Sequence, residues 1–374
     1  MTRSQRAMLF APPEDERTAW LRLTLIPGLG GQAQRTLLKT FGLPQAIFKA
    51  RGAELRSAIG DALATLLANH DAEAEITAAL NWAAEPGNYL ISLADPAYPP
   101  ALLDSADPPV LLYAKGDITL LQNPMLAIVG SRNATRQGEL DAEAFASHLA
   151  QAGLTIVSGL ALGIDAAAHR GALKTPASTV AVIGTGIDRI YPARNAELAR
   201  QIGGQGVILS EFPLGLGPLA HNFPRRNRII AGLARGCLVV EAADRSGSLI
   251  TARLAAEGGR EVFAIPGSIH SPLSHGCHRL IRQGAKLVES ASDILEELAW
   301  EDVVRPTPTV DLETTPPTDD ETNVIKALGD SPCDLETLVA RSGLTPDALL
   351  AMLLPMELDG RIASLPGGRY QKLG

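Results

Sequence analysis

The sequence predicts an α/β protein built around a doubly wound, mostly parallel sheet, with a small helical domain before it and a winged-helix-like domain after it. Between residues 120 and 300, short apolar runs rich in β-branched residues recur at intervals of about 25 to 30 residues, the length of one βαβ unit. Helical patterns fill the intervals, which favours parallel strands. After residue 322, three helical patterns and a hairpin pattern predict the winged helix.

The length and composition are those of a multidomain globular protein. The chain has 374 residues, of which 46% are hydrophobic and 20% charged, and a domain usually holds about 100 to 200 residues. No apolar run is long enough to span a membrane, and the N-terminus has no signal-peptide pattern. The three scattered cysteines show neither disulfide nor metal-ligand spacing. We therefore expect a cytoplasmic protein with no membrane segment, metal or cofactor.

Shifts in composition predict how the chain is divided. The segment 301–322 is rich in Pro, Thr and acidic residues and has almost nothing to bury, so we interpret it as a flexible linker. The expected regions are a helical module of the SAM or helix-hairpin-helix type (1–85), a proline-rich extended connector (86–119), the α/β domain (120–300), the linker (301–322) and the winged-helix-like domain (323–374).

A glycine-rich turn joins two predicted helices of the N-terminal module. The turn, Ile26-Pro27-Gly28-Leu29-Gly30-Gly31, contains a Gly-x-Gly pattern. Helix, Gly-x-Gly turn and helix can together offer backbone N–H groups to a phosphate. A tight turn between helices needs the same glycines for steric reasons. We favour the steric interpretation, because motifs this short often match by chance.

Each expected strand of the α/β domain ends in a turn of small or polar residues. Ligands of doubly wound sheets bind beyond the carboxyl ends of the strands, so we expect the functional site at these turns. The expected strands are 126–129, 154–157, 179–183, 207–209, 238–240, 262–265 and 286–288.

An arginine cluster opens one of the predicted helices. The net charge of the chain is −8, yet 212–240 contains no Asp or Glu. We expect a helix to begin near Pro224. Arg225, Arg226 and Arg228 fall in its first two turns, where the helix dipole disfavours cations. A bound anion explains the cluster better than pairing with carboxylates from elsewhere in the domain, because arginine binds phosphate in a bidentate way.

Other strand ends bring polar groups to the same edge of the sheet, which together indicate a phosphate site. Phe212 and Phe223 flank the arginine cluster and either stack on a base or pack in the core. No residue is predicted to be catalytic. The expected phosphate-binding residues are Ser131, Arg132, Ser158, Gly159, Asn222, Arg225, Arg226, Asn227, Arg228, Ser246, Gly247, Ser248 and Thr251.

Signatures of enzymes are mostly missing from the sequence. The stretch Gly184-Thr185-Gly186 lacks the third glycine of a dinucleotide fingerprint, and no GxxxxGK[ST], HExxH or GxSxG occurs. The rival interpretation is hydrolysis of nucleoside monophosphates, but such phosphoribohydrolases have a PGGxGT turn and a catalytic Glu where this chain has RSGSLIT. Five histidines lack a spaced nucleophile or metal partner and are interpreted as structural or surface residues: His169, His221, His270, His275 and His278.

The last predicted helix of the C-terminal domain differs from a DNA-reading helix. Thr345 is its expected N-cap, and Pro346 lies in its first turn. A helix that reads DNA normally carries basic or amide residues, but the charged residues from Thr345 to Asp359 are all acidic. We favour protein contact or regulation over duplex reading for this domain.

Seven motifs, in this order, resemble the DNA-processing protein A (DprA) family, and the similarity runs nearly end to end. The connector segments DPAYPPALL and DPPVLLYAKGD belong to it as well. The motifs are IVGSRNAT, SGLALGIDAAAHRGAL, TVAVIGTGIDRIYPARN, ILSEFPLG, NFPRRNRIIAGL, VVEAADRSGSLITARLAAEGGREVFAIPGS and GCHRLIRQGAKLV.

The resemblance implies an extended Rossmann-like domain that binds single-stranded DNA and forms a homodimer. It implies a protein that protects incoming DNA and loads a RecA-type recombinase onto it in natural transformation and homologous recombination. Binding through phosphates predicts a steep dependence on salt. Two pockets in a dimer predict that long strands bind more tightly than short ones. The DNA contacts that the resemblance carries over are Arg132, Arg194, Arg225, Arg226 and Arg228.

Overall fold

The computed structural model describes residues 14–300, 319–329, 332–358, 361–365 and 368–373. They divide into two compact units. The first unit contains the described residues up to Trp300 other than Thr135–Gln137, and the second contains those from Asp319 onward. The predicted linker, 301–322, lies mostly outside the described residues.

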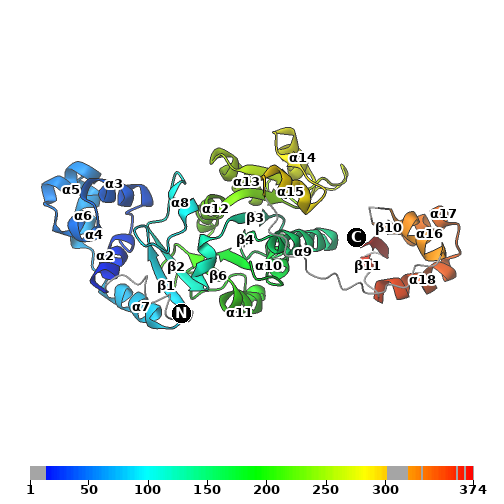
Figure 1. The fold of residues 1–374 in the computed structure, drawn as a ribbon, viewed down its shortest axis with the longest axis horizontal. Helices are drawn as coiled ribbons and strands as arrows, with labels where there is room; N and C mark the ends of the chain where they lie inside the picture. Colours follow the sequence, from blue (N-terminus) through cyan, green and yellow to red (C-terminus); the bar gives the residue numbers. More distant parts are fainter. Residues whose placement is uncertain (1–13, 301–318, 330–331, 359–360, 366–367, 374) are drawn as a thin grey trace. The chain divides into compact units, whose positions relative to one another are not determined.

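Six short helices form the N-terminal part of the first unit (Figure 1). Their apolar faces meet in a core that contains Trp20, Leu37, Ile47 and Leu67. Gly28, in the predicted glycine turn, has φ +80°, a conformation that glycine adopts without strain. The helices are α2 (Glu14–Thr24), α3 (Gly31–Phe41), α4 (Pro44–Lys49), α5 (Gly52–Ile59), α6 (Asp61–Asn69) and α7 (Glu73–Ala84).

The expected doubly wound sheet is present, and its seven predicted strands pair in parallel in the order β6-β5-β4-β3-β7-β8-β9. The chain proceeds outward from β3 to β6 and then returns to place β7 beside β3. The strand order therefore reverses between β3 and β7, where ligands of such sheets bind. The strands are β3 (Met125–Val129), β4 (Thr155–Ser158), β5 (Thr179–Val182), β6 (Val207–Ser210), β7 (Ala234–Val239), β8 (Glu261–Ala264) and β9 (Lys286–Leu287).

Two further strands, which the sequence analysis did not predict, extend the sheet at the β6 edge. They are β1 (Asn88–Ser92) and β2 (Leu111–Gly116), and β2 pairs antiparallel with both β1 and β6. Both fall in the segment that the prolines had marked as an extended connector. The prolines lie between the strands, in a loop with helix α8 (Pro100–Leu103), so they remove no ladder hydrogen bond. The short 3₁₀ helix η1 (Ile118–Gln122) then leads into β3.

Helices cover both faces of the sheet, because side chains alternate along each strand. Ile229 of α12, Ala252 of α13 and Cys277 of α14 pack on the face that carries Val129. Helices α9, α10 and α15 pack on the opposite face with Ile128. The helices are α9 (Arg136–Gln151), α10 (Ile164–Ala172), α11 (Ala196–Gln205), α12 (Asn222–Leu233), α13 (Ser248–Glu257), α14 (His275–Arg282) and α15 (Ala291–Glu297).

The second unit has the helices and hairpin of the predicted winged helix. Thr345 accepts a hydrogen bond from the Ala348 N–H at 3.4 Å and so caps α18, as expected. Leu338, Leu349 and Leu353 lie in its core. The elements are α16 (Asp319–Leu328), β10 (Cys333–Asp334), α17 (Leu335–Ser342), α18 (Pro346–Leu358), β11 (Ile362–Leu365) and β12 (Arg369–Lys372).

Within the described ranges, no single helix is long and apolar enough to cross a membrane. One bent pair, Leu335–Ser342 with Pro346–Glu357, passes that test by length and composition only.

Candidate functional site

A cavity of about 780 Å³ lies at the point where the strand order reverses. Its lining comes from the turns that follow β3, β4, β5, β6 and β7 and from helices α10, α12 and α13. The cavity therefore lies beyond the carboxyl ends of the strands, where the sequence predicted the site. We call it the switch-point cavity.

Two exposed arginines line the switch-point cavity. Arg132 follows β3, and its guanidinium carbon lies 5.6 Å from the ring centroid of Phe223. Arg245 follows β7 and was not among the predicted site residues. In the part of the chain that the structure describes, neither side chain makes an ion pair. Both are therefore available to a ligand.

Arg226 of α12 is a buried cation at the same cavity, with only 4% of the residue exposed. Its Nη1 donates to the main-chain oxygen of Val182, while its Nε has no hydrogen-bond partner among the described residues. Burial lowers the pKa of Arg226 to about 10, and the charge of Asp165 acts in the opposite direction. The guanidinium thus stays protonated at neutral pH. A buried charge without a contacting counter-ion is unfavourable by several kcal/mol, and an anion in the cavity would reduce that cost.

Asp165 is a buried carboxylate that also lines the switch-point cavity, and it organises the turn after β4. Its carboxylate accepts hydrogen bonds from the N–H groups of Gly159 at 3.1 Å and Ala161 at 3.3 Å. Burial raises the pKa of Asp165, and the nearby charge of Arg226 together with these two N–H groups partly offsets that rise. Asp165 makes no ion pair within 4 Å with any described residue, so it neutralises Arg226 only at a distance.

Ser158 and Gly159, which were predicted to bind phosphate, make hydrogen bonds inside the protein instead. The Ser158 hydroxyl donates to the Ile128 carbonyl at 2.6 Å, and the Gly159 N–H is held by Asp165. A Cβ at position 159 would overlap the Arg226 guanidinium. Glycine at this position therefore makes room for the buried arginine, and neither residue lines the cavity.

His169 is a structural histidine, as the sequence analysis interpreted it. The Thr179 hydroxyl donates to the Ile156 carbonyl, so its oxygen accepts from His169 Nδ1–H at 2.7 Å. The Leu160 N–H donates to His169 Nε2 at 3.3 Å. These bonds require the neutral Nδ1–H tautomer. Burial lowers the pKa of His169 to about 3, and the charges of Arg226 and Arg170 add to this effect.

Polar groups from the turns after β3 and β7 and from α12 line the cavity together with Arg132, Arg226 and Arg245. The Ser246 and Ser248 hydroxyls are 2.7 Å apart, and Asn227 Nδ2 donates to the Gly247 carbonyl at 3.3 Å. The predicted residues that line the cavity besides Arg132 and Arg226 are Ser131, Asn227, Ser246, Gly247, Ser248 and Thr251.

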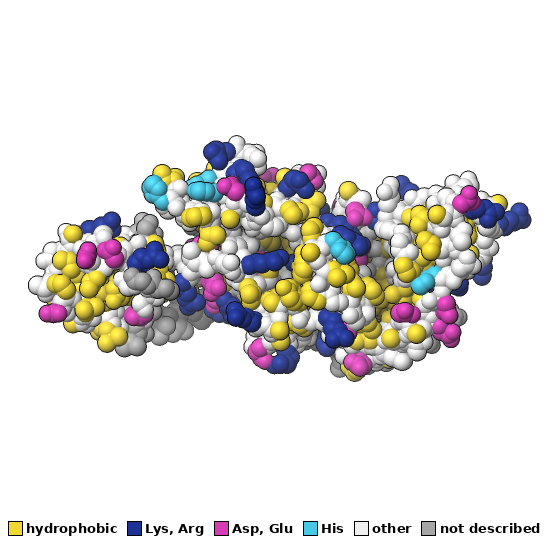
Figure 2. Space-filling model, turned by 180° about the vertical axis from the view of Figure 1, so that it is seen from behind, with side chains coloured by type: hydrophobic (Ala, Val, Ile, Leu, Met, Phe, Trp, Pro, Cys, Tyr) yellow, Lys and Arg dark blue, Asp and Glu magenta, His cyan; other side chains and the backbone are white. Residues whose placement is uncertain are grey.

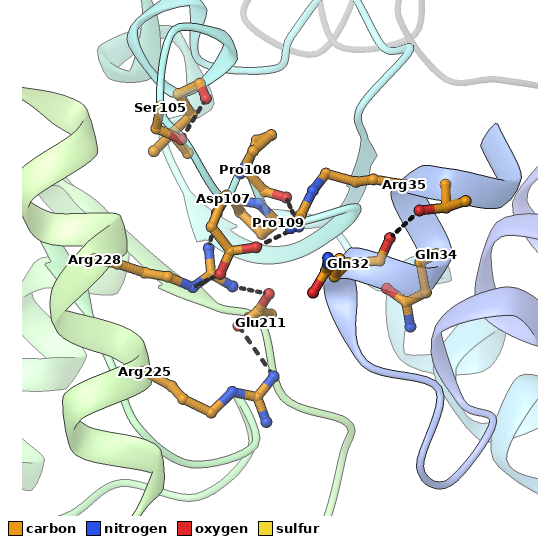
Figure 3. A network of polar contacts seen from close by, with 12 residues as sticks. Gln32, Gln34, Arg35, Ser105, Asp107, Pro108, Pro109, Glu211, Arg225 and Arg228 are labelled. Atoms are coloured by element: carbon orange, nitrogen blue, oxygen red, sulfur yellow. Dashed lines mark hydrogen bonds and ion pairs between the residues drawn. The ribbon is translucent and has the colours of Figure 1, made fainter. Parts of the chain in front are cut away.

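Arg225 and Arg228 do not line the switch-point cavity. Their side chains extend toward Glu211, and that of Arg228 also toward Asp107 (Figure 3). Arg228 Nε lies 2.9 Å from Asp107 Oδ2, and its Nη2 contacts Glu211. Arg225 reaches the second Glu211 oxygen at 3.7 Å. The alternative that the sequence left open, pairing with distant carboxylates, therefore holds for these two arginines. The cluster is divided between two sides of α12.

Two other predicted residues lie outside the cavity lining. Arg194 is exposed on the short 3₁₀ helix η2 (Ala193–Asn195). Asn222 is only 1% exposed, and its Nδ2 has no hydrogen-bond partner in the described part of the chain. Asn195, the residue after Arg194, holds η2 against the turn that follows β4, because its Nδ2 donates to the Leu160 and Ala161 carbonyls.

The aromatic residues near the cavity differ in role. Phe212 is 4% exposed and belongs to the interior. Phe223 lines the cavity together with Tyr191, with ring centroids 5.8 Å apart. Tyr191 is 46% exposed and was missed as a site residue. Tyr191 belongs to the motif TVAVIGTGIDRIYPARN, and Arg245 directly precedes the predicted Ser-Gly-Ser turn, so both lie in segments that the sequence analysis had singled out.

This arrangement is suited to binding an anion that carries an aromatic or apolar group. Three cations, hydroxyl groups and two aromatic rings converge on one cavity. The described residues contain no group of three or more His, Cys, Asp or Glu side chains that could hold a metal ion. On the face that Figure 2 shows, Lys and Arg side chains lie in separate groups among hydrophobic and acidic ones, so the attraction for anions is local.

Comparison with known sequences identifies two matching families. The family described as DNA recombination-mediator protein A matches residues 89–299, and the DprA winged helix domain matches residues 307–368. Protein Smf of Escherichia coli is 42% identical over 312 residues, which cover 78% of this chain and 80% of that protein. DNA processing protein DprA of Streptococcus pneumoniae is 53% identical over 209 residues, which cover 56% of this chain and 74% of the relative.

Two solved structures resemble the present one. The X-ray structure of S. pneumoniae DprA has a TM-score of 0.67 and 40% identity, with 75% of this chain and 97% of that chain covered. DprA from Helicobacter pylori has a TM-score of 0.52 and 32% identity, with 56% and 95% covered, and its structure is described as showing a single-stranded DNA binding mode.

Proposed function

Because this chain belongs to the DprA family of DNA-processing proteins, we propose that it binds single-stranded DNA in the switch-point cavity and acts as a recombination mediator. In this role it protects incoming single strands and loads a RecA-type recombinase onto them during natural transformation and homologous recombination. It is a binding protein and not an enzyme. Its three buried free cysteines fit a reducing compartment, the cytoplasm.

The buried Arg226 guanidinium is the observation that carries this proposal. A protonated group that is almost fully buried, with a free Nε and no ion pair in the described residues, calls for an anionic ligand. Arg132 and Arg245 add two exposed cations at the same cavity. Phosphates of a nucleic acid backbone supply successive anions, whatever the base sequence.

Single strands fit this cavity better than a duplex does. Among the described residues that line the cavity, no helix or β-ribbon is arranged to enter a major groove. Tyr191 and Phe223 lie beside the cations and offer ring faces on which an unpaired base can stack. Stacking contributes about 1 to 3 kcal/mol per base and does not depend on base identity. We therefore expect little sequence preference.

We also propose that the protein is a homodimer through the free β9 edge of the sheet. Among the described residues, β9 pairs only with β8, and an open edge is a ready surface for a second chain. Leu287 on this strand is 44% exposed, and Ile269 in the loop after β8 is 73% exposed. Two cavities per dimer would bind one long strand with avidity, and the dimer would present the surface that recruits the recombinase.

Fluorescence anisotropy with labelled oligo-dT and a hairpin duplex tests the proposal. Contact with phosphates by three cations predicts a slope of log affinity against log salt of about −2, since each contact on a single strand contributes about −0.7. We expect tighter binding to oligo-dT than to the duplex. Equal affinity for both, or release of free base from nucleoside monophosphates, would overturn the proposal in favour of duplex binding or of the enzyme.

A further inference from the structure

Helix α12 separates the switch-point cavity from a second cavity of about 1100 Å³. Phe223 and Arg226 line the first, whereas Arg225 and Arg228 line the second. The opposite wall of the second cavity is α3 of the N-terminal module, which contributes Arg35 among others. We call this second cavity the α3–α12 groove. Helix α12 contributes residues to the linings of both cavities.

The groove carries an excess of positive charge. Its lining includes four cations, Arg35, Lys39, Arg225 and Arg228, and one carboxylate, Asp107. Glu211 also pairs with the two α12 arginines (Figure 3). Four cations against two carboxylates leave two positive charges uncompensated.

Two of these cations are accessible to a ligand. Lys39 is exposed and makes no ion pair with any residue in the described ranges. The Arg225 side chain is 53% exposed and lies 3.7 Å from Glu211, which is a loose contact. The other two, Arg35 and Arg228, are held by Asp107. The groove thus combines two cations held by Asp107 with the more exposed Lys39 and Arg225.

The glycine turn of the N-terminal module also opens into this groove, through Gly30 and Gly31. Gly28 is explained by its positive φ, but Gly30 has φ −66°, and an added Cβ there would meet nothing within 4 Å. Steric need therefore accounts for only part of the motif. Helix α3 begins at Gly31 with no side-chain cap and no acidic residue in its first turn, so its start adds to the attraction for anions that the four cations establish.

We propose that the α3–α12 groove binds the phosphodiester backbone of the same single strand after it leaves the switch-point cavity. This inference rests on the proposed function. Crossing the start of α12 means travelling about 10 Å, the diameter of a helix, so a strand must fill the switch-point cavity and span this distance before it enters the groove. The N-terminal module is then a second DNA-binding element that short strands do not reach.

The test compares Lys39→Glu with Lys49→Glu in the full chain. Lys49 is an exposed lysine on α4 of the same module, but it does not line the groove. Affinities for labelled dT4 and dT20 are measured by anisotropy across a salt series. Loss of one phosphate contact predicts that Lys39→Glu weakens dT20 binding about fivefold at 0.1 M salt and reduces the steepness of the salt slope by about 0.7. Binding of dT4 should not change, and Lys49→Glu should match the wild type.

Each other outcome has a distinct meaning. If Lys39→Glu binds dT20 like the wild type, or if Lys49→Glu loses as much, the groove does not hold the strand. If Lys39→Glu weakens dT4 as strongly as dT20, the groove is no separate extension of the path, and the inference fails. If the wild type binds neither strand, the proposed function itself fails, and this inference fails with it.

Discussion

Arg228 Nε and Asp107 Oδ2 form an ion pair at 2.9 Å although 121 residues separate them in the sequence. Arg35 of α3 contacts the other oxygen of the same carboxylate (Figure 3). Arg228 also contacts Glu211, and the side chains of these two residues are only 16% and 13% exposed. One arginine of the cluster therefore fastens α12 to the connector loop and, through Asp107, to the N-terminal module.

Replacing Arg228 should reduce stability. The Arg228→Met variant leaves Glu211 and Asp107 close together with one cation fewer. Breaking a buried ion pair costs about 3 to 5 kcal/mol, and we expect about 2 kcal/mol here because Asp107 is 46% exposed. The free energy of unfolding in urea measures the loss. The control is Arg200→Met, since Arg200 and its partner Glu197 are both largely exposed; a loss in the control as large as in Arg228→Met would contradict this account.

Gly159→Ala should impair DNA binding without adding or removing a charge. A Cβ at this position overlaps the Arg226 guanidinium, which has to move from its place at the cavity. We expect affinity for oligo-dT to fall at least tenfold, about 1.4 kcal/mol. Gly204→Ala is the matched control, because an added Cβ there meets nothing within 4 Å. It lies inside α11 and should gain about 0.5 to 1 kcal/mol in stability with unchanged binding. Equal binding by the two variants would show that Arg226 takes no part.

The protein should lose stability in acid because His169 is buried in its neutral form. Its pKa is about 3 in the folded protein against 6.5 for the free side chain, so the unfolded chain takes up a proton first as the pH falls below 6.5. Stability from this group is therefore complete above pH 6.5 and decreases down to about pH 3. The slope approaches about 1.4 kcal/mol per pH unit below pH 6.5, so the loss between pH 6.5 and pH 4.5 is about 2 kcal/mol.

The His169→Gln variant isolates that contribution. It lacks the titrating ring, so its stability should depend less on pH than that of the wild type, although it starts lower at pH 7 because the bonds to Thr179 and Leu160 are altered. Unfolding in urea at pH 7 and pH 4.5 gives the comparison. A stability difference between the two proteins that stays constant across this range would contradict the buried neutral histidine.

Leu287→Asp should weaken the proposed dimer. A carboxylate on the exposed β9 edge opposes pairing with a second copy, and loss of the dimer should remove the extra affinity for long strands. Sedimentation gives the mass, and anisotropy with dT20 and longer strands gives the avidity. Leu43→Asp, at another exposed leucine, is the control. If Leu287→Asp keeps the mass of the wild type, the dimer does not form through this edge.

The fold and the location of the site could be predicted because they depend on local patterns. Apolar runs and polar turns fix the strands and their carboxyl ends, and both come from neighbouring residues. The helical periodicity could also have predicted that the arginine cluster is divided between two faces of α12. Arg226 precedes Ile229 and Ile230 by three and four residues and so shares their buried face, whereas Arg225 and Arg228 share another.

Other features depend on contacts between distant segments, which the sequence does not reveal. Nothing near Arg228 indicates that Asp107 and Glu211 are its partners. β1 and β2 were missed because prolines surround them and because β6, with which β2 pairs, follows much later in the chain. Ser158 was predicted to bind phosphate because it lies in a turn after a strand. Its hydroxyl instead donates to the carbonyl of Ile128, which belongs to the neighbouring strand β3.

The most direct test of the central claim is the affinity for labelled oligo-dT, over a salt series, of Arg132→Glu against Lys115→Glu. Arg132 is an exposed cation at the switch-point cavity. Lys115 is exposed on β2, the strand next to the edge strand β1, and does not line that cavity. The account predicts that Arg132→Glu loses at least fivefold in affinity at 0.1 M salt and flattens the salt slope by about 0.7, with Lys115→Glu unchanged. Equal affinity and equal slope for the two variants would contradict it.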